Sequence, residues 1–182
     1  MTAPAVPEHG ITPEDIASAG AVPADLPGLP QAIDAAVDAI RTYCGWHVWP
    51  QRDETLTLDG EGGSVLTLPT MHVTNIAEIR EHGAVVDAPA YEWSRTGDVK
   101  RVVGRWTRRW RGIEVDLVHG YQKVPAALWA LVLDSVADAV SNPAGAPTAI
   151  GPFQWGAQIP ASSRWLSEQR QILDRYQLPA VI

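Results

Sequence analysis

Residues Gly112–Asn142 read GIEVDLVHGYQKVPAALWALVLDSVADAVSN, and this stretch decides the fold. Its first half alternates apolar Ile113, Val115 and Leu117 with acidic Glu114 and Asp116. Alternation with a period of two is typical of a strand that buries one face. We therefore predict a half-buried strand over residues 113–119.

The second half of the stretch predicts a turn and an enclosed helix. Gly120 permits a sharp turn, and Pro125 suits a first helical turn because its missing N–H would be unpaired there anyway. The helix that follows is apolar on most sides, and only Asp134, Asp138 and Ser141 form a narrow polar stripe. This block displays no catalytic group, so it predicts a scaffold.

Length, charge and cysteine content limit the class of protein. The 182 residues suit one domain with arms, and the net charge is −7. The N-terminus lacks the pattern of a signal peptide, and the apolar runs are too short for a membrane helix. The single cysteine, Cys44, fits a reducing compartment. We expect a protein made in the cytosol that does not enter a membrane.

The charges are distributed unevenly along the chain. Residues 1–90 hold thirteen acids and three bases, whereas residues 91–182 hold eight acids and eleven bases. Eight of the fourteen basic residues lie between Arg95 and Lys123. Such an acidic chain is a poor general DNA binder, but a local cationic strip can face phosphate or an acidic partner.

Capping and turn residues predict the order of the elements. Thr12 and Pro13 begin a short helix that ends near Gly20, and a second helix covers residues 31–44 before Gly45. Between them, Pro23, Pro27 and Pro30 form a stiff linker. Residues 55–58 and 65–68 flank a glycine-rich turn and predict a hairpin. Further strands are expected at residues 72–81, 84–86, 91–94, 99–103, 105–111 and 113–119.

The predicted fold class is α+β. It consists of a small antiparallel sheet or partial barrel flanked by two core helices, with N- and C-terminal arms that each carry a short helix. The expected domains are a proline-rich arm at residues 1–30, a core at 31–142 and a C-terminal arm at 143–182. In the last arm, a strand near residues 153–159 precedes a helix capped by Ser162 or Ser163.

Candidate catalytic residues are few. Cys44 and His47 form a lone C-x-x-H pair, and zinc would need a second pair that the other histidines do not supply. A buried structural cysteine is the favoured interpretation, and His119 is interpreted as a hydrogen-bonded turn histidine. A small hydrolase that uses Cys44 or a histidine remains a third hypothesis. We expect no catalytic site, no metal and no cofactor.

The run from Arg105 to Arg111, RWTRRWR, is the unusual surface signal. On a strand it would place Arg105, Arg109 and Arg111 on one face, opposite Arg108 and inward-packed tryptophans. These four arginines face DNA or an acidic partner in one interpretation. In the other they lie on a solvated hairpin and pair with Glu92, Asp98, Glu114 and Asp116.

Eight tryptophans are many for this length, and Trp155 and Trp165 lie on an arm too small to bury them alone. Burial between subunits is therefore expected for this arm. The predicted portal-binding or intersubunit residues share this arm and its apolar stripe: Phe153, Trp155, Ile159, Trp165, Leu166, Ile172, Leu173 and Tyr176.

Several short motifs, taken in order, resemble one protein family. They are YCGW at 43–46, ETLTLDG at 54–60, LP at 68–69, VTNI at 73–76, YEWS at 91–94 with Gly97, and VHGY at 118–121 with Val124-Pro125. Together they resemble the head-to-tail connector (adaptor) proteins of long-tailed bacteriophages. The resemblance covers about residues 31–145, with a weaker match in the final helix.

The resemblance implies a structural virion protein without enzymatic activity. Such adaptors form a ring, typically of twelve copies, that docks under the portal at the head–tail junction. The ring extends the channel for double-stranded DNA without sequence specificity and carries the stopper and the tail. The implied partners are the portal, the stopper, DNA and further copies of the chain. The alternative is a monomeric module that binds DNA or protein through Arg105–Arg111.

Overall fold

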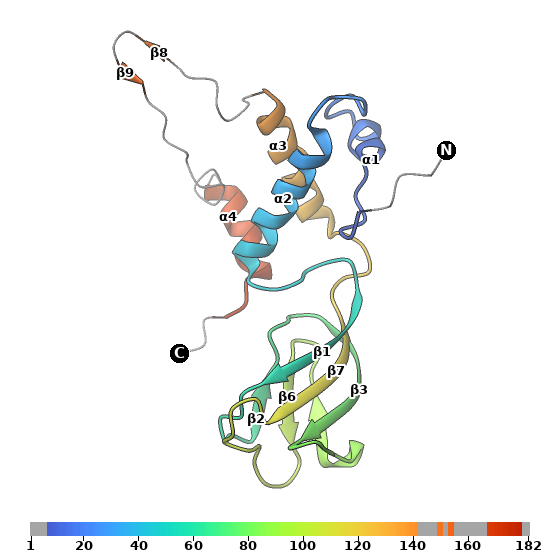
Figure 1. The fold of residues 1–182 in the computed structure, drawn as a ribbon, viewed down its shortest axis with the longest axis vertical. Coiled ribbons are helices and arrows are strands. Elements are labelled where there is room, and N and C mark those ends of the chain that lie inside the picture. The colour runs from blue at the N-terminus through green and yellow to red at the C-terminus, as the bar shows by residue number, and fades with distance from the viewer. Residues whose placement is uncertain (1–6, 142–148, 151–152, 155–166, 180–182) are drawn as a thin grey trace. The chain divides into compact units, whose positions relative to one another are not determined.

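The computed structural model describes residues 7–141, 149–150, 153–154 and 167–179. The chain divides into two units (Figure 1). The helical unit comprises Met1–Cys44 and Pro125–Gln177, and the β unit comprises Gly45–Val124 with Leu178–Ile182.

The helical unit begins with α1 (Pro13–Ser18), which a reciprocal cap holds at its N-terminus. Thr12 Oγ1 accepts a hydrogen bond from the Asp15 amide at 3.2 Å, and the Asp15 carboxylate accepts one from the Thr12 amide at 2.8 Å. This capping box satisfies two backbone donors that a helix end leaves unpaired. The predicted start at Thr12 is confirmed, and Ile16 is fully buried.

Two longer helices form the rest of this core. They are α2 (Leu29–Cys44) and α3 (Ala126–Ser141), which pack against each other. α2 ends before Gly45, whose φ of +78° suits the glycine that commonly follows a helix. The buried stripe of α2 includes Ile33, Val37 and Ile40, as its apolar periodicity predicts. The short α4 (Ser167–Leu173) and the 3-10 turn η3 (Asp174–Tyr176) follow, and α4 contacts both long helices.

The β unit contains two small antiparallel sheets. The first has the strand order β1-β7-β3-β4, with β1 at Arg52–Leu58, β7 at Ile113–His119, β3 at Val73–Glu81 and β4 at Ala84–Val85. The central strand β7 buries Ile113, Val115 and Leu117, which confirms the alternation read from the sequence.

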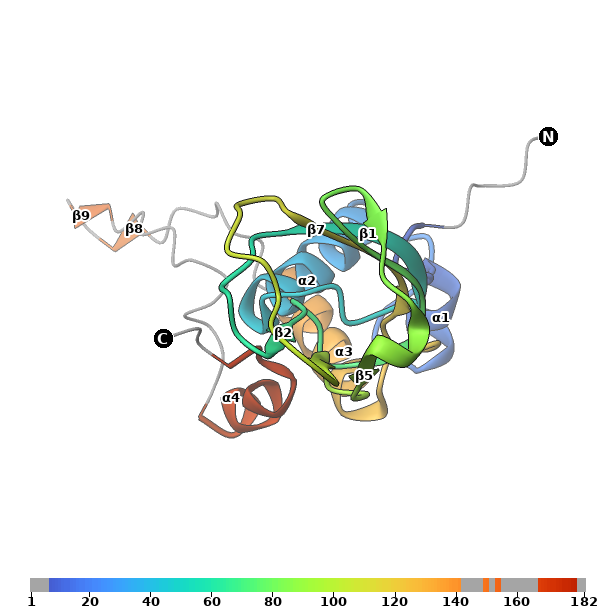
Figure 2. The ribbon, with the colours of Figure 1, turned by 90° about the horizontal axis from the view of Figure 1, so that it is seen from below.

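The second sheet has the order β2-β6-β5, with β2 at Val65–Thr67, β6 at Asp98–Arg101 and β5 at Tyr91–Trp93, which follows the 3-10 turn η1 (Ala88–Ala90). Both sheets contribute to one core, in which Leu66 and Val99 join Ile79 and Val115. Figure 2 shows β1 and β7 on the opposite side of this unit from β2 and β5. The predicted α+β class is confirmed, with two small sheets and no closed barrel in the described chain.

Two local predictions are wrong. β1 and β2 do not form a hairpin, because β1 pairs with β7 and β2 pairs with β6. The link at residues 59–63 instead passes from one sheet to the other, and its three glycines allow the close approach of another segment. Residues 105–111 do not form a strand, as described below.

The remaining short strands are β8 (Ala149–Ile150) and β9 (Phe153–Gln154), which pair with each other. Of the described helices, none is both long and apolar enough to cross a membrane.

Candidate partner-binding surfaces

The predicted arginine strip is an irregular connection between β6 and β7, and we call residues 102–112 the arginine loop. Its backbone lies beside the link at residues 59–63. The Gly60 amide donates to the Arg109 carbonyl at 2.9 Å, and the Gly62 amide donates to the Thr107 carbonyl at 2.9 Å. A Cβ on Gly60 would lie 2.2 Å from the Thr107 oxygen, so this close contact requires glycine. Residues 105–111 do not form a strand, because their backbone bonds to the link at residues 59–63 and not to another strand. In addition, Arg111 has a φ of +50°, which lies outside the β region.

Trp106 anchors the arginine loop in the core of the β unit. Its side chain is buried, and its indole Nε1 donates to the Val99 carbonyl at 3.1 Å. The guanidinium of Arg101 lies over the ring, 4.2 Å from the ring centroid, which is a cation–π geometry. The inward packing predicted for Trp106 is therefore confirmed.

Glu81 at the end of β3 adds a second anchor. One of its carboxylate oxygens accepts a hydrogen bond from the Thr107 amide at 2.6 Å, and the other pairs with Arg101. Charge-assisted hydrogen bonds of this kind are stronger than neutral ones. The base of the arginine loop is therefore held by side chains as well as by the backbone.

The arginines of this loop point into solvent. Arg105, Arg108, Arg109 and Arg111 are exposed, and none of them forms an ion pair with the residues that the structure describes. Their positive charges are thus available to a partner, as the binding hypothesis requires.

Two of the four carboxylates proposed as internal partners, Glu114 and Asp116, pair with Arg80 instead. Arg80 binds Glu78, Glu114 and Asp116 at 2.5, 2.9 and 2.8 Å. Hydrogen bonds from Thr55 and Arg80 hold the pKa of Asp116 below its ordinary value. Two of the carboxylates that the solvated-hairpin interpretation needed therefore neutralise a different arginine.

Trp110 does not pack inward. It is 85% exposed, as is Val103 in the same loop, and Val102 is also exposed. The strand prediction placed Trp110 beside Trp106, but the turn at residues 110–111 breaks that alternation. The sequence did not predict that Val102, Val103 and Trp110 would form an exposed apolar tip of the loop. Its signal for such a tip was the Val102-Val103 pair next to Gly104.

The C-terminal helix is partly accessible. Leu173 is fully buried in the helical unit, whereas Ile172 and Tyr176 are half-buried. Tyr43 of α2 donates from its hydroxyl to Asp174 at 2.6 Å, and this hydrogen bond raises the pKa of Tyr43. From this position Ile172 and Tyr176 can contact another chain more readily than Leu173 can. Trp155, Ile159, Trp165, Leu166 and the side chain of Phe153 lie outside the described residues.

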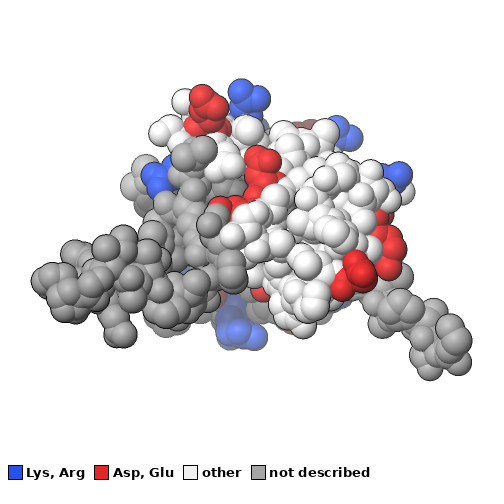
Figure 3. Space-filling model, turned by 90° about the horizontal axis from the view of Figure 1, so that it is seen from above, with Lys and Arg blue, Asp and Glu red and all other residues white. Residues whose placement is uncertain are grey.

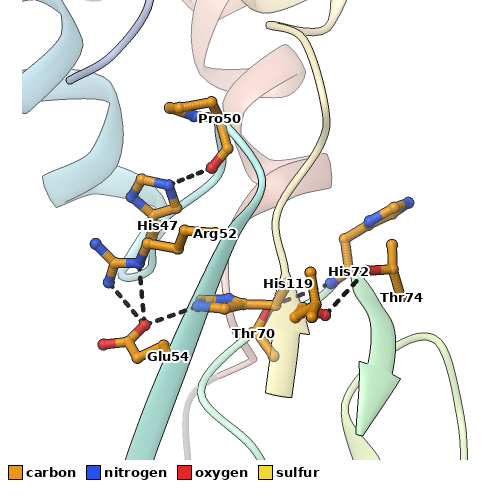
Figure 4. Close-up of polar contacts among 9 residues, drawn as sticks. His47, Pro50, Arg52, Glu54, Thr70, His72, Thr74 and His119 are labelled. Atoms are coloured by element: carbon orange, nitrogen blue, oxygen red, sulfur yellow. Dashed lines mark hydrogen bonds and ion pairs between the residues drawn. The ribbon is translucent and has the colours of Figure 1, made fainter. Parts of the chain in front are cut away.

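His119 is buried and lies at the centre of a partly buried polar network at the end of β7 (Figure 4). Its Nε2 donates to Glu54 at 2.7 Å, and its Nδ1 accepts from the Thr70 hydroxyl at 3.1 Å. Arg52 also binds Glu54, at 2.7 Å. Burial lowers the pKa of His119, so its neutral form is favoured. Both ring nitrogens take part in hydrogen bonds, as expected for the hydrogen-bonded histidine predicted from the sequence.

Cys44 is fully buried at the end of α2. Burial raises the pKa of its thiol to about 12, which disfavours the thiolate that a nucleophile requires. Among the described residues, no group of three or more His, Cys, Asp or Glu side chains is arranged to hold a metal ion.

Comparison with known proteins identifies the architecture. No protein-family model matches the sequence, and no curated protein matches it. A chain from the neck of a native gene transfer agent (GTA) particle, computed with C12 symmetry, superposes with a TM-score of 0.65 at 16% identity. The superposition covers 100% of this chain and 96% of that one. The fold is that of a neck chain.

Two further structures agree with this result. A chain from the neck of the empty GTA particle, computed with C6 symmetry, gives a TM-score of 0.63 with the same identity and coverage. A chain from the virion of the native GTA particle gives 0.58 over 85% of this chain and 79% of that one. The resemblance to head-to-tail connectors is thereby confirmed at the level of the fold.

Proposed function

We propose that this chain is a structural neck protein, an adaptor that forms a ring under the portal. The observation that carries the proposal is the whole-chain likeness to a neck chain from a particle computed with C12 symmetry. The ring would extend the DNA channel at the head–tail junction and provide the platform for the stopper and the tail. It would be made in the cytoplasm of a bacterial host and would act without cofactor or enzymatic activity.

A ring of identical copies needs two different surfaces on each copy. A head-to-tail interface closes into a ring when its rotation divides the circle evenly. The arginine loop is our candidate for one of these surfaces. The likeness to a C12 assembly supports twelve copies.

The charge distribution suits a DNA conduit. Strong phosphate contacts would hinder the passage of DNA, because each contact adds to a salt-dependent affinity. A chain with a net charge of −7 and one local group of exposed arginines would let DNA pass without sequence-specific contacts.

The C-terminal arm is our candidate for portal docking. Ile172 and Tyr176 offer partly exposed apolar area, and Phe153, Trp155, Ile159, Trp165 and Leu166 supply the large apolar side chains of the preceding segment. Leu173 stabilises the helix from inside instead, because it is fully buried.

Native mass spectrometry with the portal protein of the same genome tests this function. We expect a complex of the portal ring with a ring of this chain. Ile172→Ser with Tyr176→Ser should weaken the complex, whereas Thr42→Ser on an exposed position of α2 serves as the matched control. A chain that stays monomeric and ignores the portal would contradict the proposal.

The alternative is a monomeric module that binds DNA or protein through the arginine loop. The four exposed arginines without an ion pair in the described chain favour it. This module would bind double-stranded DNA with an affinity that falls steeply as salt rises. The same portal experiment, run beside a DNA titration, separates the two functions.

A further inference from the structure

The arginine loop combines exposed apolar side chains with unneutralised charge on a fixed base. Trp110 and Val103 are each 85% exposed, and the four arginines around them are exposed as well. Trp106 and Glu81 hold the base of the loop, so the tip is presented in a defined place. Tryptophan has a large apolar surface, so a partner that covers it gains a large part of its binding free energy there.

This composition favours a protein partner over DNA. Contacts with phosphate require cationic or hydrogen-bonding groups, and Val103 supplies neither. Tryptophan and arginine are the residues enriched at the energetic centres of protein interfaces. The expected partner therefore presents a protein surface that is acidic and partly apolar.

The helical unit of this chain has a surface of that kind. Its described residues include ten acids and three bases. In Figure 3 acidic side chains are spread across the view, and the basic ones lie toward its edge. The charge of this unit is thus opposite to that of the arginine loop.

Within the helical unit, residues 7–13 and α2 enclose a groove of about 440 Å³. Three carboxylates line it, those of Glu8, Asp34 and Asp38, against the single guanidinium of Arg41. Pro7, Pro13 and Pro30 add accessible apolar surface, whereas Ile11 and Ile33 are buried. An acidic groove with apolar walls is complementary to arginine side chains beside a tryptophan.

His9 fixes the wall of this groove. Its ring is buried, its Nδ1 accepts from the Ile11 amide at 3.1 Å, and its Nε2 contacts Asp34 at 2.9 Å. With Nδ1 accepting, Nε2 carries the proton and donates to Asp34, so this histidine adds no net charge. Residues 7–13 are therefore tied to α2, and the groove is a built feature of the helical unit.

We propose that the arginine loop of one copy docks into this acidic groove on a second copy. The contact is heterologous, with a loop on one side and a groove on the other, so it can propagate from copy to copy and close a ring. This inference rests on the proposed function, for which it supplies the contact between subunits.

Sedimentation velocity over a concentration series, with the full chain at low and high salt, tests this contact. We expect the chain to self-associate and the association to weaken at high salt, because exposed charges are screened. Arg108→Glu with Arg109→Glu should raise the dissociation constant at least about tenfold, and Trp110→Ala should act in the same direction. Glu8→Arg with Asp38→Arg should also weaken association, and this pair leaves the contact between His9 and Asp34 in place.

The decisive variant combines the four reversals in one chain. If the arginine loop and the groove meet, the combined variant should recover most of the association that either pair of reversals removes. The matched control is Arg95→Glu with Lys123→Glu, which reverses two exposed bases outside the loop and should leave association unchanged. Circular dichroism checks that each variant is folded.

The other outcomes overturn the contact in distinguishable ways. If Arg108→Glu/Arg109→Glu associates like the unmodified chain, the contact is wrong but the neck function stands. The contact is equally wrong if the combined variant does not recover. If those arginine reversals abolish only the binding of double-stranded DNA, the loop is a DNA contact. If the unmodified chain stays monomeric and also ignores the portal, the proposed function fails too.

Discussion

The side chains of His119 and Glu54 meet at 2.7 Å across the neighbouring strands β7 and β1. Burial raises the pKa of Glu54, but hydrogen bonds from Arg52 and His119 outweigh it and hold that pKa below its ordinary value. Burial lowers the pKa of His119 more than the nearby Glu54 raises it. The pair therefore holds an ionised carboxylate beside a neutral imidazole.

The first prediction concerns acid stability. For His119, the unfolded chain binds a proton near pH 6.5 and the folded chain only at lower pH, so stability falls as pH drops below about 6.5. For Glu54, stability is lost as pH falls below about 4.5 toward its lowered folded pKa. In each of these two pH ranges, the difference of one bound proton lowers the free energy of unfolding by at most about 1.4 kcal/mol per pH unit.

Urea unfolding from pH 8 to pH 4 measures this dependence. His119→Gln should be less stable at pH 8 but should flatten the decline that begins near pH 6.5. His82→Gln, at an exposed histidine, is the control and should keep the original profile. A His119→Gln profile parallel to that of the unmodified chain would contradict the assignment.

The second prediction concerns the support of the arginine loop. Gly60→Ala would place a Cβ 2.2 Å from the Thr107 oxygen, so the loop must move away. We expect a loss of about 1–3 kcal/mol, the usual cost of overpacking. Gly83→Ala is the control, because its φ of +79° is strained but no atom lies within 4 Å.

Hydrogen exchange distinguishes these two glycine variants. Gly60→Ala should reduce protection at the Gly62 and Trp106 amides, which bond the loop to the link at 59–63. Gly83→Ala should cost about 1 kcal/mol and leave those amides protected. Unchanged exchange in both variants would show that the close approach is not needed.

The third prediction concerns the ion-pair cluster on the first sheet. Arg80→Ala would leave Glu78, Glu114 and Asp116 close together without their cation, so like charges would repel. We expect the thermal midpoint to fall by a few degrees, which is the shift that a loss of about 1 kcal/mol of stability produces. Arg95→Ala, at an exposed arginine outside this cluster, should change it little.

Salt provides the check on that mechanism. The difference between Arg80→Ala and the unmodified chain should shrink in 1 M sodium chloride, because salt screens the repulsion of exposed carboxylates. A difference that is independent of salt would point to lost packing of the arginine stem.

The fourth prediction concerns Cys44. A thiol with a pKa of about 12 has on the order of a thousand times less thiolate near neutral pH than one at 9.0. Iodoacetamide should therefore label the folded chain very slowly and the urea-unfolded chain rapidly. Cys44→Ala should leave self-association and portal binding unchanged. Rapid labelling of the folded chain would instead support the hypothesis that Cys44 is reactive.

Local signals in the sequence were sufficient for most elements. Thr12 and Asp15 identify the first helix because a capping box involves residues only three apart. Ile113, Val115 and Leu117 identify the central strand because its pattern follows from one buried face. The arginine strip and the apolar C-terminal helix were also visible, since both depend on residue type within a short window.

The sequence by itself therefore determined the α+β class, most of the element order and the residues that carry exposed charge. Tertiary structure alone decided how distant segments meet. It paired β1 with β7, placed residues 59–63 beside Thr107 and Arg109, and turned Trp110 outward while Trp106 was buried. The physical reason is that strand pairing and burial depend on contacts between residues far apart in the chain, which no local periodicity encodes.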